Sequence, residues 1–286
     1  MFEIEKTIPL GDEEFRLIRE LIRDFSGIYF DDNSKSLLER RLNGRLKSHN
    51  IRNFRDYYRY LLYDRRREDE LLEIMDILTV NETYFFREKN QLTAFSEEIL
   101  PEIKKRKAKG KQIRILSAGC SSGEEPYTIA MLIRESGLFR GWDIEIVGSD
   151  INRRVLKMAR HGVYRRKSFR CTEDYYIKKY FEPQEDQSFR IKDDLKELVH
   201  FGHLNLLDSM KVRFLGMMDV IFCRNVLIYF DMPSKKRVAE SFYRILNPEG
   251  FLLLGHAESL INISSDFTLK HLKHDLVYVK PGEKEV

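Results

Sequence analysis

The chain has 286 residues, of which 42% are hydrophobic and 34% are charged, and its formal net charge is +4. This composition is typical of a soluble globular protein with one large domain or two smaller ones, and the mild charge permits an acidic partner without demanding nucleic acid. No apolar run approaches the roughly 20 residues that a membrane-spanning helix needs. Cys120, Cys171 and Cys223 are widely spaced, which favours reduced thiols of a cytoplasmic protein over a disulfide framework or a metal site.

The first part of the chain, residues 1–80, is predicted to be helical. Apolar residues recur there every three to four positions, which places one apolar stripe on each helix. The stripes are Phe15, Ile18, Leu21, Ile22 and Phe25; Leu37, Leu38, Leu42 and Leu46; Phe54, Tyr57, Tyr58, Leu61 and Leu62; and Leu71, Leu72, Met75 and Leu78. Short helices joined by short loops predict a small bundle.

Positive charge is concentrated in this helical part. Between Asp31 and Arg67 there are eleven Lys and Arg residues against five Asp and Glu residues. One interpretation is an ordinary solvated face. The other is a docking surface for an acidic partner, with Arg40, Arg41, Arg45 and Lys47 as its candidate residues.

The pattern changes after about residue 110. Strand-like runs at 113–119, 144–150, 198–207, 218–225 and 251–258 alternate with helix-like runs at 124–135, 152–160 and 234–247. Such alternation predicts a mainly parallel sheet with helices on both faces. The segment 266–280 is predicted to add antiparallel strands.

The polar and aromatic segment 162–197 interrupts the alternation and is too long for a plain loop, so we expect a small insertion of helix and hairpin. The expected domains are a helical one over 1–80, a linker with a helix over 81–110, and an α/β domain over 111–286.

Ligands of open α/β sheets bind at the carboxyl ends of the strands. Asp150 ends the second predicted strand, where a carboxylate can accept hydrogen bonds from both hydroxyls of a ribose. The alternative is that Asp150 caps the helix that follows it. We favour the ribose, because a glycine turn follows the strand before it.

That turn reads SAGCSSGEEPY over 117–127. It lacks both the G-x-G-x-x-G spacing of dinucleotide-binding turns and the G-K-[ST] of a P-loop. A diphosphate beside Glu124 and Glu125 would meet like charge. S-adenosylmethionine (SAM) carries a ribose but no phosphate, and both its ammonium and its sulfonium are positive. The turn followed by an acid therefore favours SAM.

Four stretches together resemble the bacterial chemotaxis receptor methyltransferases, the CheR family: NETYFFRE (81–88), SAGCSSGEEPY (117–127), GSDIN (148–152) and FCRNVLIYF (222–230). The phrase LNLLD at 204–208 fits as well. The resemblance covers nearly the whole chain. It implies a Rossmann-like class I SAM-dependent methyltransferase domain of the α/β class, with a small all-α N-terminal domain and a small inserted β-subdomain.

The resemblance implies roles for residues on these motifs. Cofactor contacts are expected from Asn81, Thr83, Arg87, Gly119, Glu124, Asp150, Asn205, Leu206, Arg224 and Asn225. The resemblance alone does not decide which of the adjacent Glu124 and Glu125 faces the cofactor. Catalytic positioning roles are expected for Arg87, Arg224 and Tyr229, with Arg87 or Arg224 holding the incoming carboxylate.

The family's reaction is methyl transfer from SAM to glutamate side chains of chemoreceptors, which leaves S-adenosylhomocysteine and glutamyl methyl esters. The implied partner is the acidic helical region of a receptor in the bacterial cytoplasm, with the enzyme a monomer recruited to receptor arrays. Some members bind a receptor's C-terminal peptide through a glycine-rich loop in the insertion. The corresponding stretch here, EPQEDQSFRIKDD, has no glycine, so we expect no such tether.

Two alternatives remain open. One is a nucleic-acid methyltransferase. The end of the fourth strand argues against it, because it reads CRNVLIYF and not the N/D-P-P-Y/F turn of enzymes that methylate exocyclic amines. The other is a module that binds SAM or its product without catalysis and signals through the helical domain.

Overall fold

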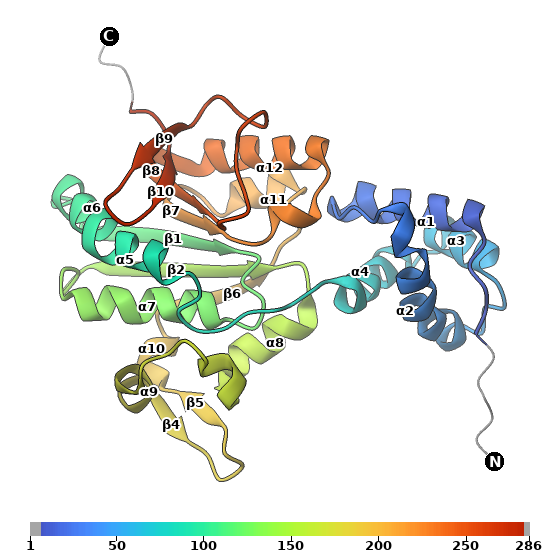
Figure 1. Ribbon diagram of the computed structural model, residues 1–286, viewed down its shortest axis with the longest axis horizontal. Coiled ribbons are helices and arrows are strands. Elements are labelled where there is room, and N and C mark those ends of the chain that lie inside the picture. Colours follow the sequence, from blue (N-terminus) through green and yellow to red (C-terminus); the bar gives the residue numbers. More distant parts are fainter. Residues whose placement is uncertain (1–6, 283–286) are drawn as a thin grey trace. The chain divides into compact units, whose positions relative to one another are not determined.

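The computed structural model describes residues 7–282 (Figure 1). The chain divides into two compact units, of which the first runs to Val80 and also includes Tyr229–Ser234. The second comprises Asn81–Ile228 and continues from Lys235. None of the described helices is long and apolar enough to cross a membrane.

Helices dominate the first unit. They are α1 (Asp12–Ser26), α2 (Lys35–Ser48), α3 (Phe54–Tyr63) and α4 (Arg67–Leu78), with a short 3-10 turn, η1 (Asp32–Ser34), before α2. The predicted apolar stripes form the core, and Ile18, Leu42 and Tyr57 are each 0% exposed. The segment Tyr229–Ser234 joins this unit through an antiparallel bridge between Ile28 and Phe230.

A buried carboxylate organises the centre of the first unit. Glu70 is 3% exposed and accepts hydrogen bonds from Arg45 Nε (2.9 Å) and the Tyr57 hydroxyl (2.5 Å). The His49 Nε2 atom lies 2.7 Å from the same carboxylate. Burial acts to raise the pKa of Glu70, but the hydrogen bonds outweigh it and the pKa is lowered.

This geometry corrects half of the expected docking surface. Arg45 is held by Glu70, and Arg41 donates to the main-chain oxygens of Ile77 (2.6 Å) and Leu78 (3.2 Å). Both side chains therefore brace α2 against α4 instead of facing a partner. Arg40 and Lys47 are exposed, and they remain candidates for docking.

Replacing Arg45 with methionine is expected to destabilise the helical unit by about 3 kcal/mol, because Glu70 would stay buried without its main partner. Faster hydrogen–deuterium exchange of peptides from α2 and α4 would measure this loss. Since the pKa of Glu70 is lowered from 4.5, the stabilisation is present above about pH 4.5 and is lost as the pH falls below it. Arg40→Met, on the exposed side of the same helix, is the control. Equal exchange in both variants would contradict this role of Arg45.

The second unit is built on a seven-stranded sheet with the strand order β6-β2-β1-β7-β8-β10-β9. Its strands are β1 (Gln112–Ala118), β2 (Asp143–Asp150), β6 (Val199–His203), β7 (Met218–Cys223), β8 (Leu246–Leu254), β9 (Thr268–His271) and β10 (Leu276–Val279). The first five in the order are parallel, whereas β10 runs antiparallel to both β8 and β9. This confirms the predicted α/β class with antiparallel strands near the C-terminus.

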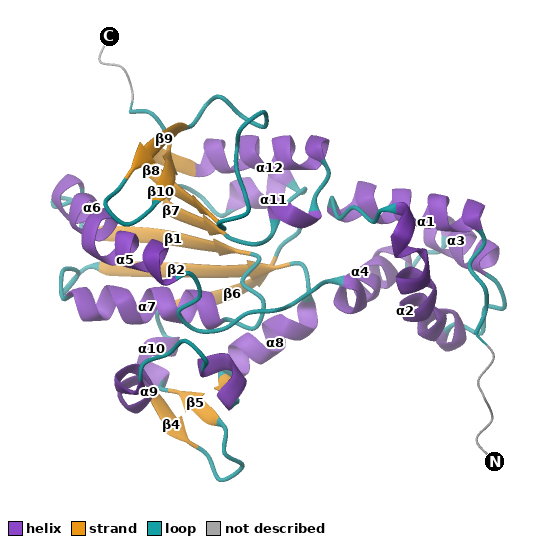
Figure 2. Ribbon diagram, viewed as in Figure 1, coloured by secondary structure: helices purple, strands orange, loops and turns teal. Residues whose placement is uncertain are grey.

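Helices cover both faces of this sheet, with α7 on one face and α12 on the other (Figure 2). The helices that lie wholly in the unit are α5 (Lys89–Ala94), α6 (Leu100–Arg106), α7 (Glu124–Ser136), α8 (Arg153–His161) and α11 (Ser209–Phe214), and a π-turn, η2 (Phe95–Ile99), joins α5 to α6. The unit also holds most of α12 (Met232–Ile245) and of the 3-10 turn η4 (Leu227–Tyr229), which are divided between the two units by the assignment of Tyr229–Ser234 to the first. The core between these layers includes Phe95 and Phe222, whose rings meet edge to face at 5.1 Å.

The inserted segment has its own small antiparallel sheet, with the order β3-β5-β4. Its elements are β3 (Val163–Tyr164), η3 (Arg166–Phe169), α9 (Asp174–Tyr180), β4 (Phe181–Pro183), β5 (Phe189–Ile191) and α10 (Asp193–Lys196). The segment is anchored by an aromatic cluster in which Phe85, Phe169 and Phe181 contact one another with ring centroids 4.9–5.1 Å apart.

Candidate active site

The order in which strands are added to the sheet reverses between β1 and β7, which are parallel neighbours although β2 and β6 lie between them in sequence. In sheets of this kind, the crevice at such a switch is the usual ligand site. The carboxyl ends of β1, β2 and β7 all reach this edge, so the segments that follow Ala118, Asp150 and Cys223 form the candidate site.

The loop after β1 is held in a strained conformation. Ser121 has a φ angle of 49°, between Gly119 at 76° and Gly123 at 94°. The N–H groups of Gly119 and Cys120 both donate to the main-chain oxygen of Ser149, at 2.8 and 2.9 Å. These bonds fasten the loop to the end of β2.

The packing of the chain itself requires both glycines. A Cβ atom on Gly119 would lie 2.3 Å from Val226 Cγ2, and one on Gly123 would lie 2.9 Å from Ala159 Cβ. The left-handed φ angles of the two glycines and these contacts already account for them, so they carry no information about the ligand.

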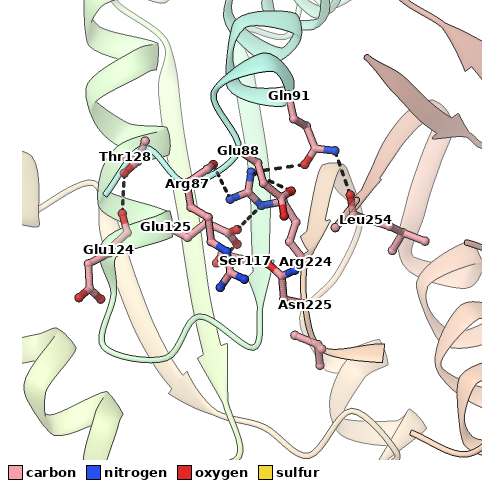
Figure 3. Close-up of polar contacts among 12 residues, drawn as sticks. Arg87, Glu88, Gln91, Ser117, Glu124, Glu125, Thr128, Arg224, Asn225 and Leu254 are labelled. Atoms are coloured by element: carbon pink, nitrogen blue, oxygen red, sulfur yellow. Dashed lines mark hydrogen bonds and ion pairs between the residues drawn. The ribbon is translucent and has the colours of Figure 1, made fainter. Parts of the chain in front are cut away.

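The two glutamates at the start of α7 point in different directions (Figure 3). Glu124 is 2% exposed and accepts hydrogen bonds from the hydroxyls of Ser122 (2.7 Å) and Ser168 (3.1 Å), the latter in the inserted segment. Burial raises its pKa, against the effect of these hydrogen bonds. Glu125 accepts from the Ser117 hydroxyl (2.7 Å) and from Arg224 Nε (2.8 Å). Glu125, and not Glu124, therefore lies at the ends of β1 and β7.

Arg224 joins the main segments of the site. Besides Glu125, its guanidinium donates to the main-chain oxygen of Arg87 (2.8 Å) and to Gln91 Oε1 (3.4 Å), and it lies 3.9 Å from Glu88. Its side chain is only 3% exposed. The expectation that Arg224 could hold a substrate carboxylate is thereby corrected, because its donors face groups of the protein.

Arg87 lies in the loop before α5, between two residues with left-handed backbone: Phe86 (φ 59°) and Glu88 (φ 60°). Such conformations are costly for residues other than glycine, and they concentrate at functional sites. The Arg87 side chain donates to the main-chain oxygen of Glu82 at 2.9 Å and lies over the Tyr84 ring at 5.7 Å. Unlike Arg224, it forms no ion pair among the residues that the structure describes.

Asp150 closes the β2 side of the site. One carboxylate oxygen accepts the N–H of Ser121 and the other the N–H of Asn152, each at 2.8 Å. The helix α8 is capped by the Asn152 side chain, which accepts from the N–H groups of Arg154 and Val155. Asn152, and not Asp150, therefore caps α8, while the carboxylate of Asp150 holds the turns that follow β1 and β2.

Other expected residues border the same edge. Asn205 accepts the N–H of Leu207 at 3.0 Å, and Leu206 is 7% exposed. Asn81 accepts a hydrogen bond from the Ser121 hydroxyl through its main-chain oxygen at 3.3 Å. Thr83 is half-buried in the same loop as Arg87.

Tyr229 belongs to the first unit, where its main-chain oxygen accepts the N–H of Tyr29 at 2.8 Å. The second unit taken by itself therefore does not bring Tyr229 together with Arg87, and its catalytic role stays a prediction.

Two supporting residues were missed by sequence reasoning. Glu258 accepts the N–H groups of Asn225 (2.7 Å), Gly255 (2.7 Å), Val226 (2.9 Å) and Ile228 (3.2 Å), which fixes the loop after β7. Gln91, 1% exposed, links Arg224 to the main-chain oxygen of Leu254 at 2.9 Å. Neither residue carries a local signal, since their partners lie far away in the sequence.

Comparison with known proteins agrees with this arrangement. The model of the CheR methyltransferase SAM binding domain matches residues 81–275, and that of the CheR methyltransferase all-alpha domain matches residues 13–79. The chain is 40% identical to chemotaxis protein methyltransferase 2 of Vibrio cholerae over 96% of this chain and 95% of that protein. It is 38% identical to the chemotaxis protein methyltransferase of Borreliella burgdorferi, covering 87% and 88% of the two chains. The corresponding Escherichia coli protein is 33% identical over 94% and 92%.

The two family models cover almost all of the described chain, and the residues that shape the strand ends lie within the SAM-binding match. This protein therefore belongs to the CheR methyltransferase family and is a SAM-dependent methyltransferase.

Proposed function

We propose that this protein methylates glutamate side chains of chemoreceptors, forming glutamyl methyl esters and S-adenosylhomocysteine. The observation that carries the proposal is the placement of two carboxylates, Asp150 and Glu125, at adjoining strand ends of a CheR-family chain. A cofactor that has a ribose and a cationic end, and no phosphate, fits this edge.

The residues present fit SAM. Asp150 would hold the ribose hydroxyls, and Glu125 would attract the cationic methionyl end, a role that we transfer from Glu124. When bound, SAM supplies an electrophilic methyl group. Asn205 and Leu206 would border the adenine, and Gly119, Asn81, Thr83 and Asn225 would line the site.

No strong general base is needed for this reaction, because a glutamate of pKa about 4.3 is already ionised at neutral pH. The enzyme has to orient the carboxylate and exclude water, and orientation can contribute roughly 7–11 kcal/mol. Arg87 is the cation suited to hold the substrate, because its guanidinium donates one hydrogen bond within the described protein, to the main-chain oxygen of Glu82, and its other N–H groups can bind a carboxylate. Tyr229 would add a hydrogen-bond donor, and Arg224 would position Arg87 and Glu125.

The helical unit would dock on an acidic helical region of the receptor in the cytoplasm, through exposed bases such as Arg40 and Lys47. We further propose that the enzyme acts as a monomer, and without a tether, because its β4–β5 connection, residues 184–188, has no glycine.

The proposal is tested by incubating the protein with tritium-labelled SAM and receptor cytoplasmic fragments. Base-labile label on the receptor is the expected result. Label on added nucleic acid instead would support the alternative methyltransferase, and tight SAM binding without transfer to either would support a non-catalytic module. Either result would overturn the proposal.

The cofactor assignment makes a second prediction. Asp150→Asn replaces one acceptor by a donor and removes the charge, so the Kd for SAM should rise at least about 30-fold, as expected for lost hydrogen bonds to a charged group. Isothermal titration calorimetry measures this change. Asp143→Asn, at the opposite end of the same strand, is the matched control, and equal affinities for the two variants would refute the role of Asp150.

A further inference from the structure

A short basic segment of the inserted region lies outside the residues assigned so far. Arg165, Arg166, Lys167 and Arg170 are all exposed, and we call these four residues the basic rim. Between them, Ser168 (8% exposed) and Phe169 (7% exposed) turn inward. The 3-10 turn η3 thus presents its bases to solvent while its other side chains anchor it.

The anchoring places the rim beside the loop that carries Arg87. The N–H of Phe85 donates to the main-chain oxygen of Ser168 at 2.9 Å, and the Phe85 and Phe169 rings stack at 5.1 Å. The Ser168 hydroxyl also binds the buried Glu124. These contacts tie η3 both to the loop and to the start of α7, so its position relative to Arg87 is fixed.

Tyr84 connects the rim directly to Arg87. The guanidinium of Arg170 lies 3.7 Å from the centre of the Tyr84 ring, and that of Arg87 lies 5.7 Å from the same ring. Glu82 pairs with Arg170 at 2.8 Å, and its main-chain oxygen accepts from Arg87. Arg87 and Arg170 therefore meet at the same tyrosine, which joins the rim to the loop that carries Arg87.

The charge of the rim is compensated in part, since Arg165 acts on Asp186, whose pKa it helps to lower. Within the described part of the chain, the side chains of Arg166 and Lys167 form no ion pair or hydrogen bond, whereas Arg170 is neutralised by Glu82. Lys167 acts electrostatically on the buried carboxylate of Glu124, whose pKa it helps to lower against the effect of burial. Arg166 and Lys167 can therefore pair with charges of a partner without first breaking a contact.

We propose that the basic rim binds acidic side chains that flank the target glutamate on the substrate, and so selects glutamates in acidic surroundings. This inference rests on the proposed function, because it assumes that the substrate carboxylate meets Arg87. A polypeptide that presents one glutamate to Arg87 has to pass Tyr84 and the rim next to it. Opposite charges at such an exposed contact mainly speed the encounter of enzyme and substrate and fix the register in which they dock.

The test is the double variant Arg166→Glu/Lys167→Glu, assayed with receptor cytoplasmic fragments and labelled SAM. We expect kcat/KM for the receptor to fall about tenfold, with kcat at saturating receptor and the Kd for SAM unchanged. The difference from the wild type should shrink at high salt, where exposed charges are screened beyond roughly 3–10 Å. If the reversed charges impair folding, the test is repeated with the neutral double variant Arg166→Ala/Lys167→Ala.

Lys105→Glu/Lys109→Glu is the matched control, since both lysines are exposed and precede the amino end of β1, whereas the candidate site lies at its carboxyl end. A receptor fragment whose acids next to the methylated glutamate are changed to amides should lose activity with the wild type but not with the rim variant. Changing those acids to lysine should partly rescue the rim variant.

Unchanged kcat/KM in the rim variant would overturn the inference while leaving the proposed function intact. A rim variant that methylates normally but no longer binds vesicles containing phosphatidylserine would assign the rim to a lipid surface instead, and would also overturn it. By contrast, if the wild type transfers no label to receptors at all, it is the proposed function that fails.

Discussion

Replacing Arg224 with methionine is expected to destabilise the second unit by about 3 kcal/mol, because Glu125, whose side chain is only 14% exposed, would lose the partner of its charge. The guanidinium is nearly inaccessible and holds Glu125, Gln91 and the main-chain oxygen of Arg87. The protein has one tryptophan, Trp142, which is 9% exposed in this unit. Denaturant unfolding followed by Trp142 fluorescence therefore measures the loss.

A companion variant separates the structural role from the chemical one. Arg224→Met/Glu125→Gln removes the unpaired charge, so most of the lost stability should return. Methyl transfer should stay impaired, since neither Arg87 nor the cofactor would be held as before. Arg213→Met, at an exposed arginine in α11, controls for removing a positive charge. If Arg224→Met unfolded like this control, the central role of Arg224 would be wrong.

Arg87→Ala is expected to lower kcat by about a hundredfold or more, the size of effect seen when one charge-stabilising donor is removed from an active site. The fold should survive, because the side chain is half-buried and contributes one hydrogen bond to a main-chain oxygen and one contact with Tyr84. Steady-state transfer to receptor fragments measures the change, and Trp142 fluorescence checks the fold.

Two further variants sharpen this result. Arg87→Lys keeps the charge but loses the planar fork that matches a carboxylate, so it should recover only part of the activity. Lys89→Ala, two residues along and 77% exposed at its side chain, should behave as the wild type. Full activity of Arg87→Ala would remove this residue from the mechanism.

Much of this architecture could be predicted from the sequence. The alternation of strand-like and helix-like runs gives the parallel sheet, since each buried strand has to be followed by a helix that covers a face. Asp150 and the turn after β1 were recognisable because their positions follow from the end of a strand. The helical bundle followed from its apolar stripes.

The direction of individual side chains was harder to predict. Glu124 and Glu125 are neighbours at the start of one helix, and only the contacts of Ser168 and Arg224 distinguish them. Arg41 and Arg45 each lie three positions after a buried leucine of α2, Leu38 and Leu42, so helical spacing alone could have placed them toward the core. Gln91 and Glu258 depend on partners distant in sequence.

The carboxylate of Glu258 also bears on how the protein is made. It fixes Asn225, which precedes it by 33 residues, so during synthesis on the ribosome the loop after β7 emerges well before its anchor. Until Glu258 leaves the exit tunnel, the nascent chain lacks a complete site even though β1, β2 and β7 have been synthesised. A shortened catalytic fragment would therefore have to extend beyond this glutamate to keep the loop after β7 anchored.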